Sequence, residues 1–280
     1  MEYPKWKKNG KIMEKNMRFG FIGCGNMGGA ILKGGEGLGL LSPENVCIYD
    51  ISKEVTDRLR ADGYKICTDL RELCSESDII VLAVKPQYFP DVRKEIEGLT
   101  HGKCALSIMA GIYIKDLKEA LGEETRIFRT MPNTPALVNR GVFAVCVEND
   151  ASPEEKELIS KLLSSMGKVY EATEEMTDVF CGFSGSGPAY VAMFVEALAD
   201  GAVLEGMPRA LAYKVALETV EGSARLMLEK NMHPGALKDM VSSPKGTTIE
   251  GVKALEKGAF RHSVMESVIA SVEKTRKLGK

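Results

Sequence analysis

The sequence has little of what metal sites and disulfide scaffolds need. Its three histidines, His101, His233 and His262, lie far apart and form no ligand motif, and its seven cysteines include no C-x-x-C pair. An odd number of scattered cysteines does not favour a disulfide framework, whereas it fits a reducing cytoplasm. We therefore expect a cytoplasmic protein without a metal site.

The chain also lacks a strong net charge and a long apolar run. Its formal net charge is -2 over 280 residues, so nothing favours binding to nucleic acid or to an anionic membrane. No apolar run approaches the roughly 18 residues that a membrane-spanning helix needs. The polar, lysine-rich residues 1–16 lack the apolar stretch of a signal peptide, and we interpret them as a flexible extension. The remaining composition is that of a soluble globular protein.

Three glycines carry the first functional motif. An apolar strand pattern enters a turn with Gly23, Gly25 and Gly28, and a helical pattern follows. This is G-x-G-x-x-G in a strand–turn–helix context, the fingerprint of a dinucleotide-binding unit. Gly23 permits the tight turn, Gly25 lets a diphosphate approach the backbone, and Gly28 allows close packing of helix on strand. We expect the diphosphate at the helix N-terminus, which begins with Asn26 and Met27.

An acidic residue ends the second predicted strand, at 46–50. Asp50 lies about 20 residues beyond the glycines, where a carboxylate binds the adenosine ribose hydroxyls and repels a 2′-phosphate. This position favours NADH over NADPH. The alternative is that Asp50 caps the helix that begins at Ser52. Lys53 and Arg58 could accept a phosphate, so both cofactors remain open.

Strand and helix patterns alternate through the first half of the chain. Buried strands are predicted at 78–84, 104–108, 126–130, 141–147 and 169–171, and a capping box followed by proline predicts a helix from Ser152. The loops after the strands lie where open α/β sheets bind ligands. The pattern predicts an α/β, Rossmann-like, doubly wound domain over residues 17–173.

The second half of the chain is helical. From residue 174 the strand patterns end, and helices are predicted at 188–204, from 208 to about 230, and at 236–241, 247–256 and 260–278. Small and apolar residues cover several helix faces. We therefore expect an all-helical domain over residues 174–280 whose excess apolar surface is buried in a homodimer.

Two loops in this half contain serine or threonine. Residues 182–188, GFSGSGP, lack the spacing and the preceding strand of a serine nucleophile, so a flexible helix entry and an active-site lining role remain open. Residues 242–248, SSPKGTT, place hydroxyls and a glycine at a helix N-terminus, which suits a carboxylate. Plain N-capping by Thr247 or Thr248 explains the same residues equally well.

Five motifs occur in order along the chain. They are the G-x-G-x-M-G loop, AVKPQ at 83–87, MPNTP at 131–135, SGSGPAY at 184–190 and SPKGTT at 243–248. Together they resemble the pyrroline-5-carboxylate reductase family, from residue 17 to nearly the C-terminus. The resemblance implies reduction of the cyclic imine L-1-pyrroline-5-carboxylate to L-proline with NADPH or NADH, the last step of proline synthesis. It also implies a helical dimerisation domain, often assembled into decamers.

The resemblance assigns roles to particular residues. It implies that the substrate carboxylate and ring nitrogen bind Ser243, Gly246, Thr247 and Thr248, with the Thr248 hydroxyl nearest the imine nitrogen and the nicotinamide supplied by the dimer partner. Glu174 aligns with an acid near the substrate. The alternative is that it is a glutamate at the start of a helix, without a role in binding. Lys85, Ala110 and Asn133 are expected on the nicotinamide side. The full set of dinucleotide contacts expected beyond the glycine loop is Asp50, Ala83, Val84, Lys85, Pro86, Met109, Ala110, Gly111 and Asn133.

One residue departs from the family pattern. Many members have two glycines in the SPGGTT loop, and Lys245 replaces the first. A lysine held at positive φ would cost roughly 1–2 kcal/mol. We expect its side chain to point to solvent, which would make the change harmless.

Two other functions remain as alternatives. A β-hydroxyacid dehydrogenase shares the G-x-G-x-M-G loop but needs a positioned lysine on a central helix, and no lysine lies between Lys168 and Lys214. A nucleotide-sensing binding protein would make the SPKGTT loop incidental. Reduction of an imine needs an oriented nicotinamide more than a strong protein acid, because the imine nitrogen is itself basic. The lack of a histidine or paired-carboxylate site is therefore consistent with the reductase.

Overall fold

The computed structural model describes residues 17–146 and 151–278, which divide into two compact units. One unit contains the described residues up to 185 together with 271–278, and the other contains residues 186–270. The helix that follows residue 173 packs on the sheet and so belongs to the first unit. The domain boundary at 173/174 stays a prediction. The extension predicted at residues 1–16 lies outside the described residues.

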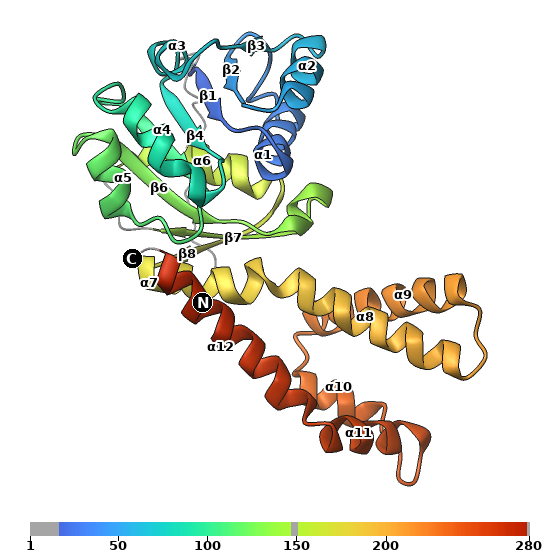
Figure 1. Cartoon of the computed structure of the whole chain (residues 1–280). Coiled ribbons are helices and arrows are strands. Elements are labelled where there is room, and N and C mark those ends of the chain that lie inside the picture. The colour runs from blue at the N-terminus through green and yellow to red at the C-terminus, as the bar shows by residue number, and fades with distance from the viewer. Residues whose placement is uncertain (1–16, 147–150, 279–280) are drawn as a thin grey trace. The chain divides into compact units, whose positions relative to one another are not determined.

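The first unit is built on an eight-stranded sheet (Figure 1). The strand order is β3-β2-β1-β4-β5-β6-β7-β8, and neighbouring strands are parallel except for β6 and β7. The order reverses at β1 and β4, as in a doubly wound fold. The strands are β1 (Phe19–Ile22), β2 (Val46–Tyr49), β3 (Lys65–Ile66), β4 (Ile79–Leu82), β5 (Cys104–Ser107), β6 (Arg126–Met131), β7 (Gly141–Cys146) and β8 (Gly167–Ala172).

Helices cover both faces of this sheet, so the side chains on both faces of its central strands are buried. Ile79 and Val81 of β4 join the apolar cluster formed with α1, α2 and α6, whereas Ile80 and Leu82 join the cluster formed with α3, α4 and α5. Burial on both faces explains why this strand is a continuous apolar run in the sequence. The helical elements are α1 (Asn26–Gly37), α2 (Lys53–Ala61), α3 (Leu70–Glu76), η1 (Pro86–Tyr88), α4 (Phe89–Ile96), α5 (Ile114–Leu121), η2 (Thr134–Val138), α6 (Pro153–Ser164) and α7 (Glu174–Phe180).

The start of α6 confirms the predicted capping box. The Ser152 hydroxyl accepts a hydrogen bond from the Glu155 backbone N–H, and the Glu155 carboxylate accepts one from the Ser152 N–H. Pro153 occupies the first helical position. These contacts satisfy backbone donors that a helix start leaves free, and they explain why the helix begins here.

The second unit is helical, as predicted. It contains α8 (Gly187–Leu204), α9 (Arg209–Glu229), α10 (Pro234–Met240), α11 (Thr247–Lys257) and most of α12 (Phe260–Leu278). Gly206 has a φ of +96°, which turns the chain between α8 and α9. These two helices pack through small buried side chains, among them Ala199, Ala212 and Ala216.

Residues 174–204 bear on the expectation that no segment is apolar enough to span a membrane. They contain a window of mean hydropathy 1.3, long and apolar enough by length and composition to cross a membrane, and only 11% of that window is buried. Charged residues such as Glu196 and Asp200 break the uninterrupted run that the sequence analysis looked for, but they do not lower the average enough. Exposed side chains such as Met193 and Leu204 form apolar surface that a protein partner would also cover.

Candidate active site

The glycine loop between β1 and α1 has the packing that its sequence predicts. Gly23 has a φ of +89°, and a Cβ there would lie 2.9 Å from the Ala83 carbonyl oxygen. A Cβ at Gly28 would lie 2.5 Å from the Gly23 carbonyl oxygen. Gly25 has open space within 4 Å, as the close approach of a diphosphate requires.

The N-terminus of α1 presents backbone donors to this space. No side chain caps the helix, and its first internal hydrogen bond runs from the Gly29 N–H to the Gly25 carbonyl at 2.8 Å. The N–H groups of Asn26, Met27 and Gly28 precede that bond and point away from the helix. This arrangement suits a phosphate or diphosphate.

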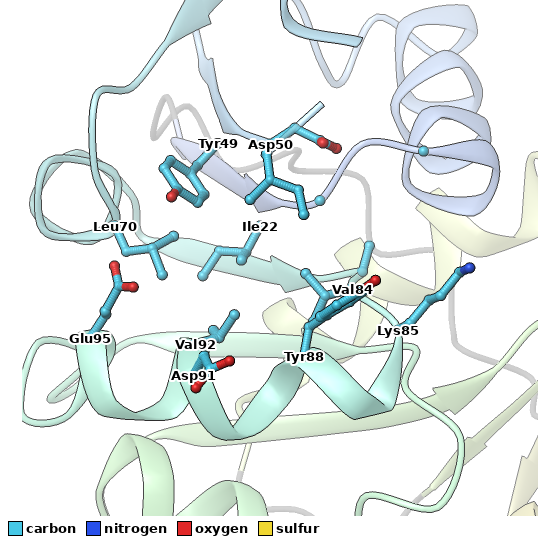
Figure 2. A pocket seen from close by; sticks show the side chains of 14 residues that line it. Ile22, Tyr49, Asp50, Leu70, Val84, Lys85, Tyr88, Asp91, Val92 and Glu95 are labelled. Atoms are coloured by element: carbon cyan, nitrogen blue, oxygen red, sulfur yellow. The ribbon is translucent and has the colours of Figure 1, made fainter. Parts of the chain in front are cut away.

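A pocket of about 370 Å³ lies outside the carboxyl ends of β1 and β4, where the strand order reverses. Figure 2 shows Tyr49 and Asp50 on one wall and Tyr88, Val92 and Glu95 on the other. Six of the predicted dinucleotide contacts line this pocket: Gly23, Gly25, Asp50, Ala83, Val84 and Lys85. The predicted Asn26, Met27, Gly28, Pro86, Met109, Ala110, Gly111 and Asn133 do not line it.

Asp50 ties the end of β2 to the glycine loop. Its carboxylate accepts hydrogen bonds from the Cys24 N–H at 2.7 Å and the Ser52 N–H at 2.8 Å. The cap of α2 is Ser52, whose hydroxyl accepts from the Val55 N–H, so the alternative that Asp50 caps this helix is wrong. The neighbouring Ile51 is 79% exposed and lines the pocket, where its apolar side chain could cover a flat ring.

The Cys24 side chain is buried and fills space within the glycine loop. Burial, and then the negative charge of Asp50, raise the pKa of its thiol to about 12, so the group is neutral at physiological pH. None of the seven cysteines, all of which lie in the described ranges, forms a disulfide bond. Within the described ranges, no group of three or more His, Cys, Asp or Glu side chains is placed to hold a metal ion.

The loops expected on the nicotinamide side follow adjacent parallel strands. Lys85 follows β4, Met109–Gly111 follows β5 and Asn133 follows β6, so all three lie at the same edge of the sheet. Gly111 has a φ of +71°, which few side chains adopt. Lys85 is exposed, and Figure 2 shows its side chain extending away from Val92.

Asn133 is buried and bridges two loops. Its side-chain oxygen accepts from the Val142 N–H at 2.8 Å, and its amide nitrogen donates to the Ser184 carbonyl at 3.0 Å. Ser184 belongs to a π-helical turn, Cys181–Gly185, in the stretch for which the sequence left open a flexible helix entry or an active-site lining role. The Ser184 hydroxyl donates to the Phe180 carbonyl at 3.0 Å, which leaves the turn well defined. The structure thus gives Asn133 a bridging role, and direct contact with the cofactor stays a prediction.

A buried ion pair beside these loops was missed by the sequence analysis. Arg129 of β6 is 2% exposed and lies 2.7 Å from the Asp178 carboxylate. Tyr113 also bonds Asp178, and burial, followed by that contact, raises the pKa of Tyr113 to about 12. An arginine inside the apolar run RIFRT was the available signal, because a buried guanidinium requires partners.

Glu174 is the first residue of α7, and its carboxylate already has protein partners. It accepts from the Ile114 N–H at 2.7 Å and lies 3.6 Å from the Arg129 guanidinium. These contacts match the helix-start alternative. Its predicted contact with the substrate remains a prediction.

The SPKGTT loop connects α10 to α11 in the second unit. Gly246 is the N-cap of α11 without a side-chain cap, so N-capping by Thr247 or Thr248 is wrong. Both threonines are exposed. A Cβ at Gly246 would displace the Ser243 hydroxyl, 2.3 Å away, and would lie 3.1 Å from the Ser243 carbonyl oxygen, so there is little space for a side chain here. Free helix N–H groups and two threonine hydroxyls therefore lie together, as a carboxylate site requires.

Lys245 has both features considered from the sequence, a backbone at positive φ and a side chain that faces solvent. Its φ is +61°, and its side chain is exposed. The solvent-facing side chain avoids a clash, but the backbone retains the strain of a left-handed conformation, roughly 1–2 kcal/mol. The family glycine at this position therefore has a conformational reason.

Comparisons with known proteins agree on one family. Residues 174–278 match the family model described as pyrroline-5-carboxylate reductase dimerisation, and residues 18–111 match that described as NADP oxidoreductase coenzyme F420-dependent. The pyrroline-5-carboxylate reductase of Escherichia coli is 44% identical over 270 residues, covering 96% of this chain and all of that protein. That of Methanosarcina acetivorans is 40% identical over 268 residues, covering 95% of this chain and 99% of that protein.

A solved structure agrees over the same length. The pyrroline carboxylate reductase of Plasmodium falciparum, with NADP bound, has a TM-score of 0.86 and 35% identity, covering 95% of this chain and 99% of that one. The agreement includes both the dinucleotide-binding and the helical parts of the sequence. The chain belongs to the pyrroline-5-carboxylate reductase family.

Proposed function

We propose that this protein reduces L-1-pyrroline-5-carboxylate to L-proline with a nicotinamide dinucleotide, the final step of proline biosynthesis. The proposal rests on two features that occur together in this chain. One is the glycine loop before α1, and the other is the start of α11, which has no side-chain cap and carries threonine hydroxyls. The first suits a diphosphate, and the second suits the carboxylate of a small substrate.

The first unit holds and orients the dinucleotide. The open face of Gly25 and the N-terminus of α1 bind the diphosphate, and the pocket beside Asp50 takes the adenosine. Lys85, Ala110 and Asn133 line the nicotinamide side. When bound, the reduced nicotinamide supplies the hydride. The chain contributes mainly proximity and orientation, because imine nitrogens are basic enough to take a proton from solvent.

The start of α11 holds the substrate. The helix N–H groups, together with Ser243, Gly246 and Thr247, bind the substrate carboxylate, and the Thr248 hydroxyl bonds the ring nitrogen. A second copy of the chain supplies the nicotinamide to each substrate site. The exposed apolar surface of α8 and the family's dimerisation model support this dimer, and larger assembly into a decamer is part of the proposal.

We further propose a preference for NADH over NADPH. Three carboxylates, Asp50, Asp91 and Glu95, line the pocket together with a single lysine, Lys85. Negative charge beside the ribose disfavours a 2′-phosphate. Lys53, which could otherwise bind that phosphate, is paired with Asp57 at 2.5 Å. The NADP bound to the Plasmodium protein is the observation against this preference.

The proposed compartment is the cytoplasm. Seven cysteines without a disulfide bond, six of them buried, are consistent with a reducing environment.

The test of this function is oxidation of NADH or NADPH followed by the loss of reduced-nicotinamide absorbance, with and without pyrroline-5-carboxylate. Imine-dependent oxidation establishes the reaction, and the two kcat/KM values give the cofactor preference. If folded dimeric protein oxidises neither cofactor, the reductase function is wrong, and dinucleotide binding alone would favour a sensing role.

A further inference from the structure

Arg129 lies at the centre of a buried polar cluster at the end of β6. Its guanidinium donates to the Ile112 carbonyl at 2.9 Å, to the Glu174 carbonyl at 2.9 Å and to the Asp178 carboxylate at 2.7 Å. The ring of Tyr113 lies 4.8 Å from the guanidinium carbon. Both charged side chains are at most 4% exposed, so water cannot replace these partners.

The cluster holds three consecutive residues that directly follow the Met109–Gly111 loop. The carbonyl of Ile112 accepts from Arg129, the hydroxyl of Tyr113 donates to Asp178 at 2.8 Å, and the N–H of Ile114 donates to the Glu174 carboxylate at 2.7 Å. The loop is therefore tethered at its C-terminal end, while β5 fixes its N-terminal end.

A second ion pair on β6 provides a comparison. The Arg126 guanidinium makes three hydrogen bonds to the Glu155 carboxylate, and its backbone pairs with Cys104 at the start of β5. Arg129 pairs with Ser107, the last residue of β5, just before the nicotinamide-side loop. The two arginines thus each pair with a buried carboxylate from the same strand, and only Arg129 contacts the segment that follows the loop.

A stability role alone does not require this cluster. Buried ion pairs contribute little net stability compared with well-packed apolar side chains, because desolvation offsets their attraction. Hydride transfer, in contrast, depends on placing the nicotinamide to within about an ångström. A loop whose following three residues are all held in place provides such placement.

We propose that Arg129, Asp178 and Tyr113 are positioning residues that hold the Met109–Gly111 loop for the nicotinamide ring. The proposal rests on the proposed reductase function. It adds residues that are expected to touch neither the substrate nor the cofactor.

The test uses the full-length protein and two ligands, NADH and ADP-ribose, of which only NADH carries the dihydronicotinamide ring. Tyr113→Phe removes only the hydroxyl that bonds Asp178 and keeps the ring over the guanidinium. We expect the Kd of NADH to rise about three- to tenfold and the Kd of ADP-ribose to stay within twofold, measured by calorimetry. In turnover, kcat should fall about tenfold or more, and the KM for pyrroline-5-carboxylate should change less than threefold.

Two further variants separate positioning from folding. Arg126→Lys weakens the comparison pair on the same strand and should leave the NADH to ADP-ribose ratio and kcat unchanged. Arg129→Lys keeps the charge but cannot reach three acceptors, so its effect should have the same pattern as Tyr113→Phe and be larger. All measurements are made at least 10 °C below the unfolding midpoint of the least stable variant, so that every variant is folded.

Three results would overturn the proposal. They are equal changes in NADH and ADP-ribose affinity for Tyr113→Phe, no change in either, or a kcat loss matched by Arg126→Lys. If the wild type lacks imine-dependent oxidation, the proposed function fails instead, and the binding comparison still decides whether these residues position the loop.

Discussion

The carboxylate of Asp50 lies 2.7 Å from the backbone nitrogen of Cys24, so the end of β2 is hydrogen-bonded to the glycine loop after β1. One side chain thus contributes both to the loop's conformation and to the charge of the adenosine pocket. Its substitution is expected to change cofactor preference more than fold.

Asp50→Asn should raise the NADPH to NADH ratio of kcat/KM by roughly tenfold. Removing one negative charge near the 2′-phosphate is expected to be worth about 1.4 kcal/mol, and the amide oxygen can still accept from Cys24. The ratio is internally controlled, because a general loop defect affects both cofactors. An unchanged ratio would mean that the charge of Asp50 does not affect binding of the 2′-phosphate of NADPH.

Gly25→Ala should weaken NADH binding at least about tenfold without preventing folding. The new methyl group meets no protein atom within 4 Å but occupies the space required by the diphosphate. Gly29→Ala is the matched control, because its Cβ makes an ordinary 3.6 Å contact and alanine favours a helix. Calorimetry on both variants tests the prediction, and equal affinities would place the diphosphate elsewhere.

Thr248→Ala should lower kcat/KM for pyrroline-5-carboxylate by about 10- to 100-fold, the usual value of a hydrogen bond to a charged group. Its thermal unfolding should match the wild type, because the threonine does not cap α11. Thr219→Ala, on the exposed surface of α9, controls for loss of a threonine. Unchanged turnover would remove Thr248 from the mechanism.

Lys245→Gly should be more stable than Lys245→Ala by about 1 kcal/mol, since only glycine relieves the strain at a φ of +61°. Both variants remove the charge, so a KM increase common to both would reveal attraction of the substrate carboxylate. Denaturant unfolding of the two variants measures the difference. Equal stabilities would show that the loop adapts to a side chain at this position.

Glu155→Gln should make the free energy of unfolding less dependent on pH in the acid range. Burial opposes ionisation of Glu155, but the bonds from Arg126 and Ser152 outweigh it, and its pKa falls below the ordinary 4.5. The unfolded chain therefore takes up this proton at a higher pH than the folded chain. The pair's stabilisation is present above about pH 4.5 and is lost as pH falls through the lowered pKa. Denaturant unfolding should show a wild-type advantage at pH 7 that shrinks below pH 4, and a constant difference would contradict this assignment.

Local sequence patterns determined the elements and their order. Burial of β4 on both faces, the glycine turn after β1, the capping box of α6 and the bounds of α12 follow from short-range residue preferences, and the structure confirms them. The two-residue β3 was not predicted, because a strand so short has no periodicity. The unpredicted division of the compact units after residue 185 depends on how α7 packs.

Tertiary structure decided what the polar side chains do. Arg129 and Tyr113 meet Asp178 across 49 and 65 residues of sequence, and Asn133 meets Ser184 across 51. The family resemblance placed Asn133 and Glu174 at ligand sites, which stays a prediction, and only the fold shows the backbone groups that each of them also contacts. The sequence also could not determine whether the backbone at Lys245 has a positive φ. Periodicity specifies which face a residue takes, but only the assembled sheet brings distant donors and acceptors within hydrogen-bonding distance.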